Sequence, residues 1–404
     1  MRVACVGNMN NNSFTIARYL RDRGIEADLL LLDDELDHFH PSADTFDLDY
    51  QAWTTQLGWG SPGRFRATPP EGVTRDLAGY DFLLTSGGVP AYLSRAGRRS
   101  DLYVPWGGDL MYYPFPRLFK DPRAQVNWVA FSRAQRQGIR TARCICSDMA
   151  NDDIARVFRS LRPAGARLRY GIPMVYTPLY NSQAIREHYD ASHWHRQFAR
   201  VRAEHDLVVF HHARHTWRLP ETDFNWKAND RLLRGFAAFL RARPEVRACL
   251  VTMEYGPHVA DSRALAAELG IAHAVRFFPR MARKDLMVGL SLCDVATGEF
   301  GMSWLSAGTV YEALAMARPL LHHRDDALYR GFFPELYPLM NARTDDEIAA
   351  ALAGWADDPE AHRRMGEAGR RWLQRYAIDE PIDAFVRLMR GEEPQAAPRT
   401  ESAA

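Results

Sequence analysis

The chain has 404 residues, of which 47% are hydrophobic and 25% charged, and its formal net charge is +1. One hydrophobic core stops growing near roughly 250 to 300 residues, so two domains are expected, and the balanced charge gives no reason to expect a nucleic-acid partner. The scattered cysteines form no CxxC pair, and no apolar run reaches the roughly 18 residues that span a bilayer, which argues against a zinc site and favours a cytoplasmic location.

The N-terminal segment has the order strand, helix, strand. The apolar stretch MRVACVGN ends in asparagine after a glycine, and the helical spacing of Phe14, Ile16 and Leu20 stops at Gly24. A second apolar strand follows at EADLLLLD. This unit predicts a parallel sheet covered by helices. Residues 36–70 show no period, and we expect a long irregular insertion or a partly ordered loop there, without an assigned role.

Later segments extend the pattern. The stretches YDFLLTSGG and DLYVPWGGD indicate strands that end in glycines, where open α/β sheets place ligand-binding loops. Prolines then interrupt every period, so we place a linker near residues 174–200. From Leu207 onward strands and helices alternate again, which predicts a second α/β domain.

These patterns predict four segments. They are an N-terminal Rossmann-like domain over residues 1–175, a C-terminal Rossmann-like domain over 176–378, a helix over 379–390 and a disordered tail over 391–404. Whether the helix over 379–390 crosses back to the N-terminal domain is left open.

The C-terminal half carries six segments in a characteristic order. They are VVFHHARHTW, NWKANDRLLRGFAAF, ELGIAHAVRFFPRMARKDL, CDVATGEF, GTVYEALAMARPLL and DPEAHRRMGEAGRRW. Together they resemble the retaining nucleotide-sugar glycosyltransferases of family four. The resemblance implies the GT-B fold, an α/β fold of two facing Rossmann-like domains with a cleft between them. It also implies transfer of a sugar from a nucleoside diphosphate donor to a glycan or lipid-linked acceptor, with retention and without a cofactor or a required metal.

The resemblance also implies donor-binding residues. Arg214 and Lys227 match the cations that contact the donor diphosphate, where fixed positive charge stabilises the departing group. The alternative is that both solvate a loop. Glu312 matches the acid that hydrogen-bonds the ribose hydroxyls. The family commonly has a second glutamate eight residues earlier; Trp304 stands there, which leaves Glu299 as the catalytic candidate on the C-terminal side.

Small residues precede the Glu312 helix. The backbone N–H groups of Gly301, Gly308 and Thr309, with the helix dipole, are candidates to face the donor phosphates. A loop needed only for packing is the alternative. The histidines at 211, 212 and 215 could suggest a metal, but they sit at a strand end without an acidic partner at motif spacing, so we expect none.

Two loops of the N-terminal half are candidates for the sugar side. PWGGDLMYYPF resembles the family's HGxD loop: Trp106 replaces the histidine, while Gly107, Gly108 and Asp109 are kept. Asp109 is the catalytic candidate there, as an acceptor of a hydroxyl hydrogen bond, with a turn-stabilising role as the alternative. In the second loop, Gly7 is followed by Asn8, Asn10, Asn11 and Asn12. Gly7, Asn10 and Asn11 are the candidates to approach the acceptor or the sugar, and the alternative is that the asparagines only cap the following helix.

A basic stretch follows the same region. Ten Lys and Arg residues stand against three aspartates between Arg95 and Arg143, with aromatic residues among them. Such a surface can rest on anionic lipid headgroups at the inner face of a membrane or bind a lipid diphosphate, and solvated helix faces explain it as well. Two other functions stay open: a nucleotide-sugar epimerase of the same fold, and a non-catalytic sugar-binding homologue, which Trp106 and Trp304 favour.

Overall fold

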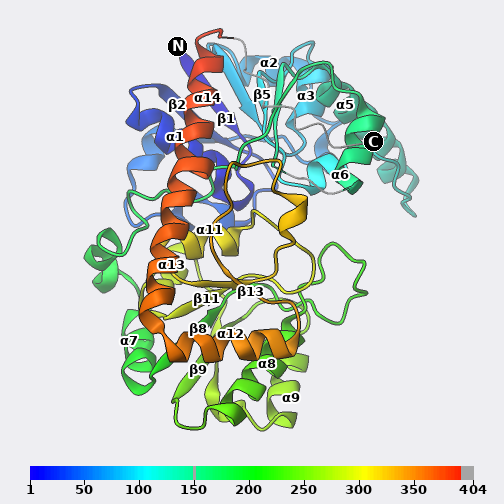
Figure 1. Cartoon of the computed structure of the whole chain (residues 1–404). Coiled ribbons are helices and arrows are strands. Elements are labelled where there is room, and N and C mark those ends of the chain that lie inside the picture. Colours follow the sequence, from blue (N-terminus) through cyan, green and yellow to red (C-terminus); the bar gives the residue numbers. More distant parts are fainter. Residues whose placement is uncertain (149–151, 393–404) are drawn as a thin grey trace. The chain divides into compact units, whose positions relative to one another are not determined.

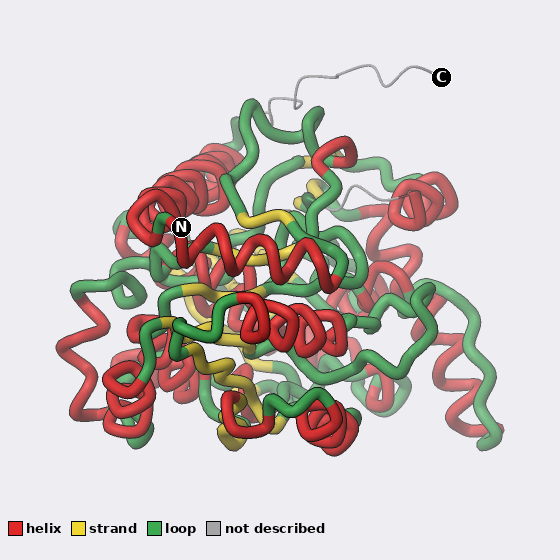
Figure 2. The backbone as a smooth tube through the Cα atoms, turned by 60° about the horizontal axis from the view of Figure 1, so that its bottom comes forward, coloured by secondary structure: helices red, strands yellow, loops and turns green. Residues whose placement is uncertain are grey.

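The computed structural model describes residues 1–148 and 152–392. It contains two compact units: Met1–Tyr176 with Tyr376–Ala404, and Thr177–Arg375, called unit 1 and unit 2 below. In each unit a parallel sheet is flanked by helices (Figures 1 and 2). The predicted α/β class with two Rossmann-like sheets is confirmed. Of the predicted disordered tail, residues 393–404 lie outside the described residues.

Unit 1 has a seven-stranded sheet in the order β3-β2-β1-β4-β5-β6-β7, with every neighbouring pair parallel. Its strands are β1 (Arg2–Val6), β2 (Glu26–Leu31), β3 (Thr54–Gln56), β4 (Phe82–Thr85), β5 (Leu102–Tyr103), β6 (Cys144–Cys146) and β7 (Ala166–Leu168). Its helices are α1 (Asn12–Asp22), α2 (Pro70–Asp76), α3 (Val89–Arg95), α4 (Gly108–Met111), α5 (Pro122–Thr141), α6 (Asp152–Leu161) and α14 (Glu380–Met389).

The predicted first helix is α1. It buries Phe14, Ile16 and Leu20, and Gly24 beyond its end has the left-handed φ of +74° that glycine tolerates. Helix α3 packs closely on α5 at Gly138, where an added Cβ would lie 2.0 Å from the Pro90 carbonyl oxygen. This approach explains why a glycine stands inside a long helix.

Of the two forms predicted for residues 36–70, the structure shows the partly ordered loop. The short strand β3 pairs in parallel with β2 at the sheet edge, and single 3-10 turns cover Asp37–Phe39, Pro41–Ala43, Asp49–Trp53 and Pro62–Arg64. Trp59 and Phe65 are buried in the core beside β4. A three-residue strand is too short for its side-chain alternation to be read from sequence.

Unit 2 has a six-stranded parallel sheet in the order β10-β9-β8-β11-β12-β13. Its strands are β8 (Leu207–His211), β9 (Ala248–Glu254), β10 (Val275–Pro279), β11 (Val295–Thr297), β12 (Leu320–His322) and β13 (Met340–Asn341). Its helices are α7 (His195–Glu204), α8 (Asn229–Ala242), α9 (Val259–Glu268), α10 (Arg283–Leu292), α11 (Gly308–Ala315), α12 (Asp345–Asp357) and α13 (Pro359–Trp372). The alternation predicted from Leu207 onward is confirmed.

The linker is shorter than predicted. Residues 184–191 form a 3-10 helix and α7 follows, and both pack on α10. Phe198 of α7 is buried and stacks on Phe278, with ring centroids 4.7 Å apart. These residues therefore belong to unit 2.

The chain returns to unit 1 after α13. A π-helical segment over Leu373–Asp379 continues into α14, which packs on α1 and pairs Asp383 with Arg23. Within the described ranges, no helix is both long and apolar enough to cross a bilayer.

Candidate functional site

Most of the predicted donor-binding residues follow the two central strands of the unit 2 sheet. Strands β8 and β11 pair in register, His211 opposite Thr297, so their carboxyl ends lie at the same edge. Two backbone hydrogen bonds then join the following loops: Lys227 N donates to Thr216 O and Phe300 N donates to Lys227 O, both at 3.3 Å. Open α/β sheets place ligands at this edge.

Lys227 and Glu299 form an ion pair at this edge. The Lys227 Nζ lies 2.6 Å from Glu299 Oε1, and the two side chains are 16% and 6% exposed. The other carboxylate oxygen of Glu299, Oε2, is buried without a hydrogen-bond partner among the described residues. Arg214 is half-buried and donates to Asn225 Oδ1 at 2.9 Å. The structure therefore brings Lys227 and Glu299 together, which spacing alone did not predict.

Glu312 is buried on α11, and both of its carboxylate oxygens have partners. His212 Nε2 donates to Oε2 at 2.8 Å, and Arg283 Nε donates to Oε1 at 2.7 Å. Burial alone would raise the pKa of Glu312, but Arg283 and His212 lower that pKa to about 2. Glu312 is therefore ionised at neutral pH. Sequence reasoning missed Arg283, which lies at the start of α10.

Small residues allow the second loop to pack closely. A Cβ at Gly301 would lie 2.6 Å from the Trp226 carbonyl oxygen, and Gly308 begins α11. The Trp304 ring meets Phe224 edge-on at 4.9 Å between centroids. Packing thus explains Gly301, while Gly308 and Thr309 stay donor-binding predictions.

Four buried polar atoms at this sheet edge have no hydrogen-bond partner in the part of the chain that the structure describes. They are His212 Nδ1, Glu299 Oε2, Trp304 Nε1 and Thr309 Oγ1. Leaving one such group unsatisfied costs roughly 1 to 3 kcal/mol, so native proteins hold few of them without a functional reason. Donors and acceptors are both present, which suits a polyhydroxyl ligand.

The loop over residues 301–307 is fixed by the segment that follows β12. Asp325 N donates to Ser303 Oγ at 2.8 Å, and the Tyr329 hydroxyl donates to Ser303 O at 2.9 Å. The Tyr337 hydroxyl donates to Leu305 O at 2.8 Å. Trp304 is thus held in one position.

The other two histidines of the strand end have side-chain partners. His211 contacts Thr297 and Asn229, and His215 contacts Ser262 and Thr252. Burial lowers the pKa of both and brings that of His215 to about 4, so both rings are neutral. In residues 1–148 and 152–392, no three His, Cys, Asp or Glu side chains are grouped to hold a metal ion.

In unit 1, Asp109 holds a turn. Its Oδ1 accepts hydrogen bonds from the backbone N–H groups of Trp106 and Gly107 at 3.0 Å, and its Oδ2 accepts one from Gly87 at 2.9 Å. Burial raises the pKa of this carboxyl to about 7. Gly108 lies against the Trp106 ring, 2.6 Å from where its Cβ would be. This is the turn-stabilising geometry that the sequence left open, and a catalytic role for Asp109 stays a prediction.

The loop after β1 has an unusual backbone. Gly7, Asn10 and Asn11 all have left-handed φ values, of 86°, 57° and 59°. Asn11 makes no side-chain capping bond to α1; Asn8 instead accepts from Phe14 N at 2.9 Å. Glu35 accepts from Asn8 N, and burial raises its pKa to about 7. Asn8 thus bonds the start of α1, as the capping alternative for the asparagines of this loop expects, whereas Glu35 was not predicted. An acceptor-side role for this loop stays a prediction.

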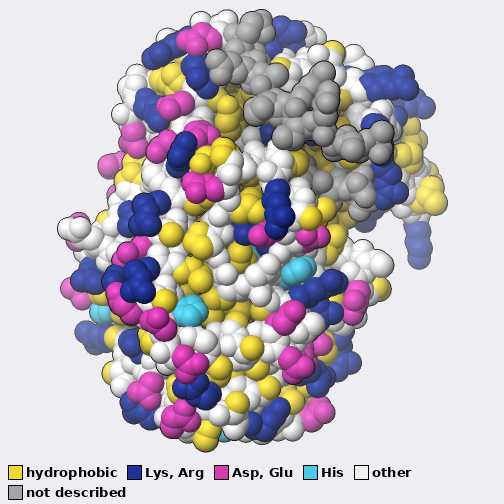
Figure 3. All heavy atoms as spheres, viewed as in Figure 1, with side chains coloured by type: hydrophobic (Ala, Val, Ile, Leu, Met, Phe, Trp, Pro, Cys, Tyr) yellow, Lys and Arg dark blue, Asp and Glu magenta, His cyan; other side chains and the backbone are white. Residues whose placement is uncertain are grey.

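Three arginines of the basic stretch form hydrogen bonds within unit 1. Arg95, Arg98 and Arg136 donate to backbone carbonyl groups. Elsewhere in the stretch, Leu118 is 91% exposed, between Arg117 and Lys120. Figure 3 shows basic side chains, with hydrophobic ones below them, at the upper right edge, to the right of the place where Figure 1 labels α5.

No known family profile matches the chain. It is 31% identical over 168 residues to a D-inositol 3-phosphate glycosyltransferase of Streptomyces coelicolor, an alignment covering 38% of this chain and 35% of that protein. The chain therefore spans about a third of the length of this curated relative. The predicted resemblance to nucleotide-sugar glycosyltransferases is confirmed.

Solved structures share the fold over nearly the whole chain. Anabaena HepE in complex with UDP matches with a TM-score of 0.62 and 14% identity, covering 97% of this chain and 100% of that one. WaaG, a glycosyltransferase involved in lipopolysaccharide biosynthesis, matches with a TM-score of 0.55 and 14% identity. This match covers 96% of this chain and 100% of that one. A UDP-N-acetylglucosamine 2-epimerase from Listeria monocytogenes matches with a TM-score of 0.55 and 13% identity. This match covers 98% of this chain and 98% of that one. The predicted GT-B fold is confirmed.

Proposed function

We propose that the chain is a glycosyltransferase that binds a nucleoside diphosphate sugar at the carboxyl edge of the unit 2 sheet. It transfers the sugar, with retention, to a glycan or lipid-linked acceptor. The observation that carries this proposal is the set of four unpartnered buried polar atoms beside the Lys227–Glu299 pair. A sugar and ribose have the hydroxyl groups that such atoms would bind. The similarity to a known glycosyltransferase supports the reaction class.

The site chemistry assigns a role to each charge. Lys227 and Arg214 would face the diphosphate and stabilise the negative charge that builds up as the sugar leaves. Once Lys227 contacts phosphate, the Glu299 carboxylate becomes available to accept hydrogen bonds from sugar hydroxyls. The diphosphate charge is thus met by side chains, and the proposal requires no metal ion or cofactor.

A binding experiment tests this proposal directly. The full-length protein is heated with a panel of nucleotide-sugars, beginning with UDP-glucose, and with UDP, UMP and glucose. We expect one nucleotide-sugar and its nucleoside diphosphate to raise the melting temperature, with stabilisation of about 2.7 kcal/mol at one hundred times Kd. The monophosphate and free sugar should have much smaller effects. A folded protein that no nucleotide-sugar stabilises would contradict the proposal.

Product analysis separates the two alternatives. A transferase releases nucleoside diphosphate and leaves the sugar on acceptor or water. An epimerase of the same fold, which the similarity to the Listeria structure keeps in view, would instead return an epimeric nucleotide-sugar without any acceptor. A non-catalytic homologue would bind the donor and form neither product.

We further propose that unit 1 touches an anionic membrane surface at residues 112–126. Tyr112, Leu118 and Val126 are 53%, 91% and 53% exposed there, and Arg117 and Lys120 flank Leu118. Burying one leucine in lipid contributes roughly 1.5 to 3 kcal/mol, so Leu118→Ser should weaken binding to phosphatidylglycerol vesicles about tenfold or more. The control is Leu328→Ser, at an exposed leucine of unit 2. Equal sedimentation of both variants with vesicles would refute the contact.

A further inference from the structure

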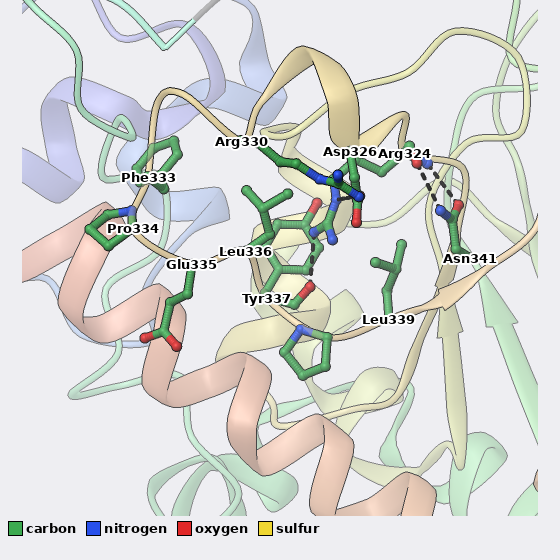
Figure 4. A pocket seen from close by; sticks show the side chains of 11 residues that line it. Arg324, Asp326, Arg330, Phe333, Pro334, Glu335, Leu336, Tyr337, Leu339 and Asn341 are labelled. Atoms are coloured by element: carbon green, nitrogen blue, oxygen red, sulfur yellow. Dashed lines mark hydrogen bonds and ion pairs between the residues drawn. The ribbon is translucent and has the colours of Figure 1, made fainter. Parts of the chain in front are cut away.

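A pocket of unit 2 is lined by the segment that joins β12 to β13. Residues between Arg324 and Asn341 line this open cavity of about 490 Å³. Figure 4 shows Arg324 and Arg330 entering it from different sides, with Asp326 between them. Apolar side chains of Phe333, Leu336 and Leu339 also line the cavity. None of these residues belongs to the predicted donor site.

Arg324 is held rigidly in the wall of this pocket. It is 3% exposed; its Nε donates to Asp326 Oδ1 at 2.7 Å and its Nη1 to Tyr337 O at 2.9 Å. Its guanidinium also lies over the Tyr337 ring at 4.3 Å, and Asn341 hydrogen-bonds its backbone on both sides. Its remaining terminal nitrogen, Nη2, has no hydrogen-bond partner among the described residues. A pre-organised guanidinium loses little entropy when it binds an anion.

Arg330 supplies a second cation to the same cavity. It is exposed, and within residues 1–148 and 152–392 its guanidinium has no hydrogen bond or ion pair. Figure 4 shows this guanidinium directed toward Arg324 and Asp326, whereas Glu335 points away from them. Two guanidinium groups therefore lie near the Asp326 carboxylate, but of the two only Arg324 pairs with it. At this end of the pocket, away from the Glu335 carboxylate, the Arg330 guanidinium favours an added anion.

Tyr337 connects the wall of this pocket to a loop of the candidate donor site. Tyr337, which holds Arg324, donates through its hydroxyl to Leu305 O of the loop that carries Trp304. The pocket and the donor loop also follow neighbouring parallel strands, β12 and β11. Ligands in the two places would therefore lie at the same edge of the sheet.

We propose that this pocket is a second anion-binding subsite that takes a phosphate monoester or carboxylate group. The Arg324 and Arg330 guanidinium groups bind the anion, and the rest of the ligand lies against Phe333, Leu336 and Leu339. Arginine binds both kinds of anion through a planar pair of N–H groups. That the anion belongs to a substrate of sugar transfer rests on the proposed function, whereas anion binding itself does not.

Inorganic phosphate is the first probe, with the full-length protein and the melting temperature as readout. Because phosphate can also bind beside Lys227, the titration uses the Lys227→Ala protein. Adding Arg330→Ala should raise the phosphate concentration for half-maximal stabilisation about tenfold, since a charge-assisted hydrogen bond is lost. Arg330→Lys should have a smaller effect, and Arg196→Ala, at an exposed arginine of α7, should have none. An unchanged phosphate response in the Arg330→Ala protein would overturn the subsite.

Glucose 6-phosphate distinguishes a substrate group from a free anion. It should stabilise the Lys227→Ala protein at lower concentration than inorganic phosphate does, whereas glucose should not stabilise it. Equal potency of phosphate and glucose 6-phosphate would overturn the substrate assignment. Stabilisation by UDP-glucose in the Arg330→Ala protein reports on the donor site separately, so failure of the subsite and failure of the proposed function give different results.

Discussion

Replacing Glu312 with alanine is expected to lower the free energy of unfolding of unit 2 by about 3 to 5 kcal/mol, because it breaks a buried ion pair from one side. The Glu312 and Arg283 side chains are each 8% exposed. Without the carboxylate, the buried Arg283 guanidinium loses its ion pair with Glu312, and His212 loses the acceptor for its Nε2. Urea unfolding followed by tryptophan fluorescence measures the loss.

A double variant separates stability from donor binding. Glu312→Leu with Arg283→Met removes both charges and keeps similar volume, a change that is often neutral for stability. We expect it to unfold near the wild-type urea concentration and to lose stabilisation by the nucleotide-sugar. Wild-type stability of Glu312→Ala alone would show that the network does not act as described.

Because the Glu312 carboxylate is ionised in the folded protein, we expect the stability of the protein to decrease at acidic pH. The pKa of Glu312 falls from an ordinary value of 4.5 to about 2 in the folded protein. A depressed pKa gives stability that is full above the unfolded value and is lost as pH falls from 4.5 toward 2. The double variant should therefore lose less stability than wild type over this range.

Replacing Lys227 with alanine is expected to reduce release of nucleotide from the donor sugar by about 10² to 10³-fold, the usual cost of removing one preorganised group that stabilises developing charge. Lys227 is half-buried; its backbone is held by bonds to Thr216 and Phe300, and its ammonium is held by the Glu299 carboxylate. Single-turnover release from the identified nucleotide-sugar measures the effect. Lys227→Arg should retain part of the rate.

In the Lys227→Ala protein, the effect of removing the ion-pair partner of Glu299 must be distinguished from the effect on catalysis. In Lys227→Ala, the 6% exposed Glu299 loses its only ion-pair partner among the described residues, which destabilises unit 2. Adding Glu299→Ala should recover that stability and leave release slow. If the double variant recovered both the stability and the rate of nucleotide release, Lys227 would contribute only to the stability of the fold. The exposed-cation control is again Arg196→Ala.

The alternation of strands and helices could be predicted because the spacing of apolar residues is set within each strand or helix. The Glu312 network could not, because its partners lie 29 and 100 residues away and meet only through packing of α10, α11 and the end of β8. Likewise, Lys227 and Glu299 meet because β8 and β11 are neighbours although β9 and β10 separate them in sequence. Sheet order, and not spacing, decides these contacts.

The sequence also could not reveal which backbone groups Asp109 and the loop asparagines bind. Asp109 matches the acid of a known loop, yet its two oxygens accept three backbone N–H groups that would otherwise be unsatisfied. Asn8 bonds the start of α1, while the candidates Asn10 and Asn11 have strained backbone angles. Such assignments depend on backbone geometry, which single residue types do not reveal.

The return of the chain to unit 1 has a consequence for folding during synthesis. Helix α14 buries Ile382 and Phe385 in a unit whose other residues end at Tyr176, and Arg23 meets Asp383 across 360 positions of sequence. Most of unit 1 is therefore translated before unit 2, but unit 1 lacks one of its helices until residues 380–389 have been made. Unit 2 is continuous in sequence and can complete its core before then. Of the two units, the one whose translation begins earlier is thus the later to finish folding.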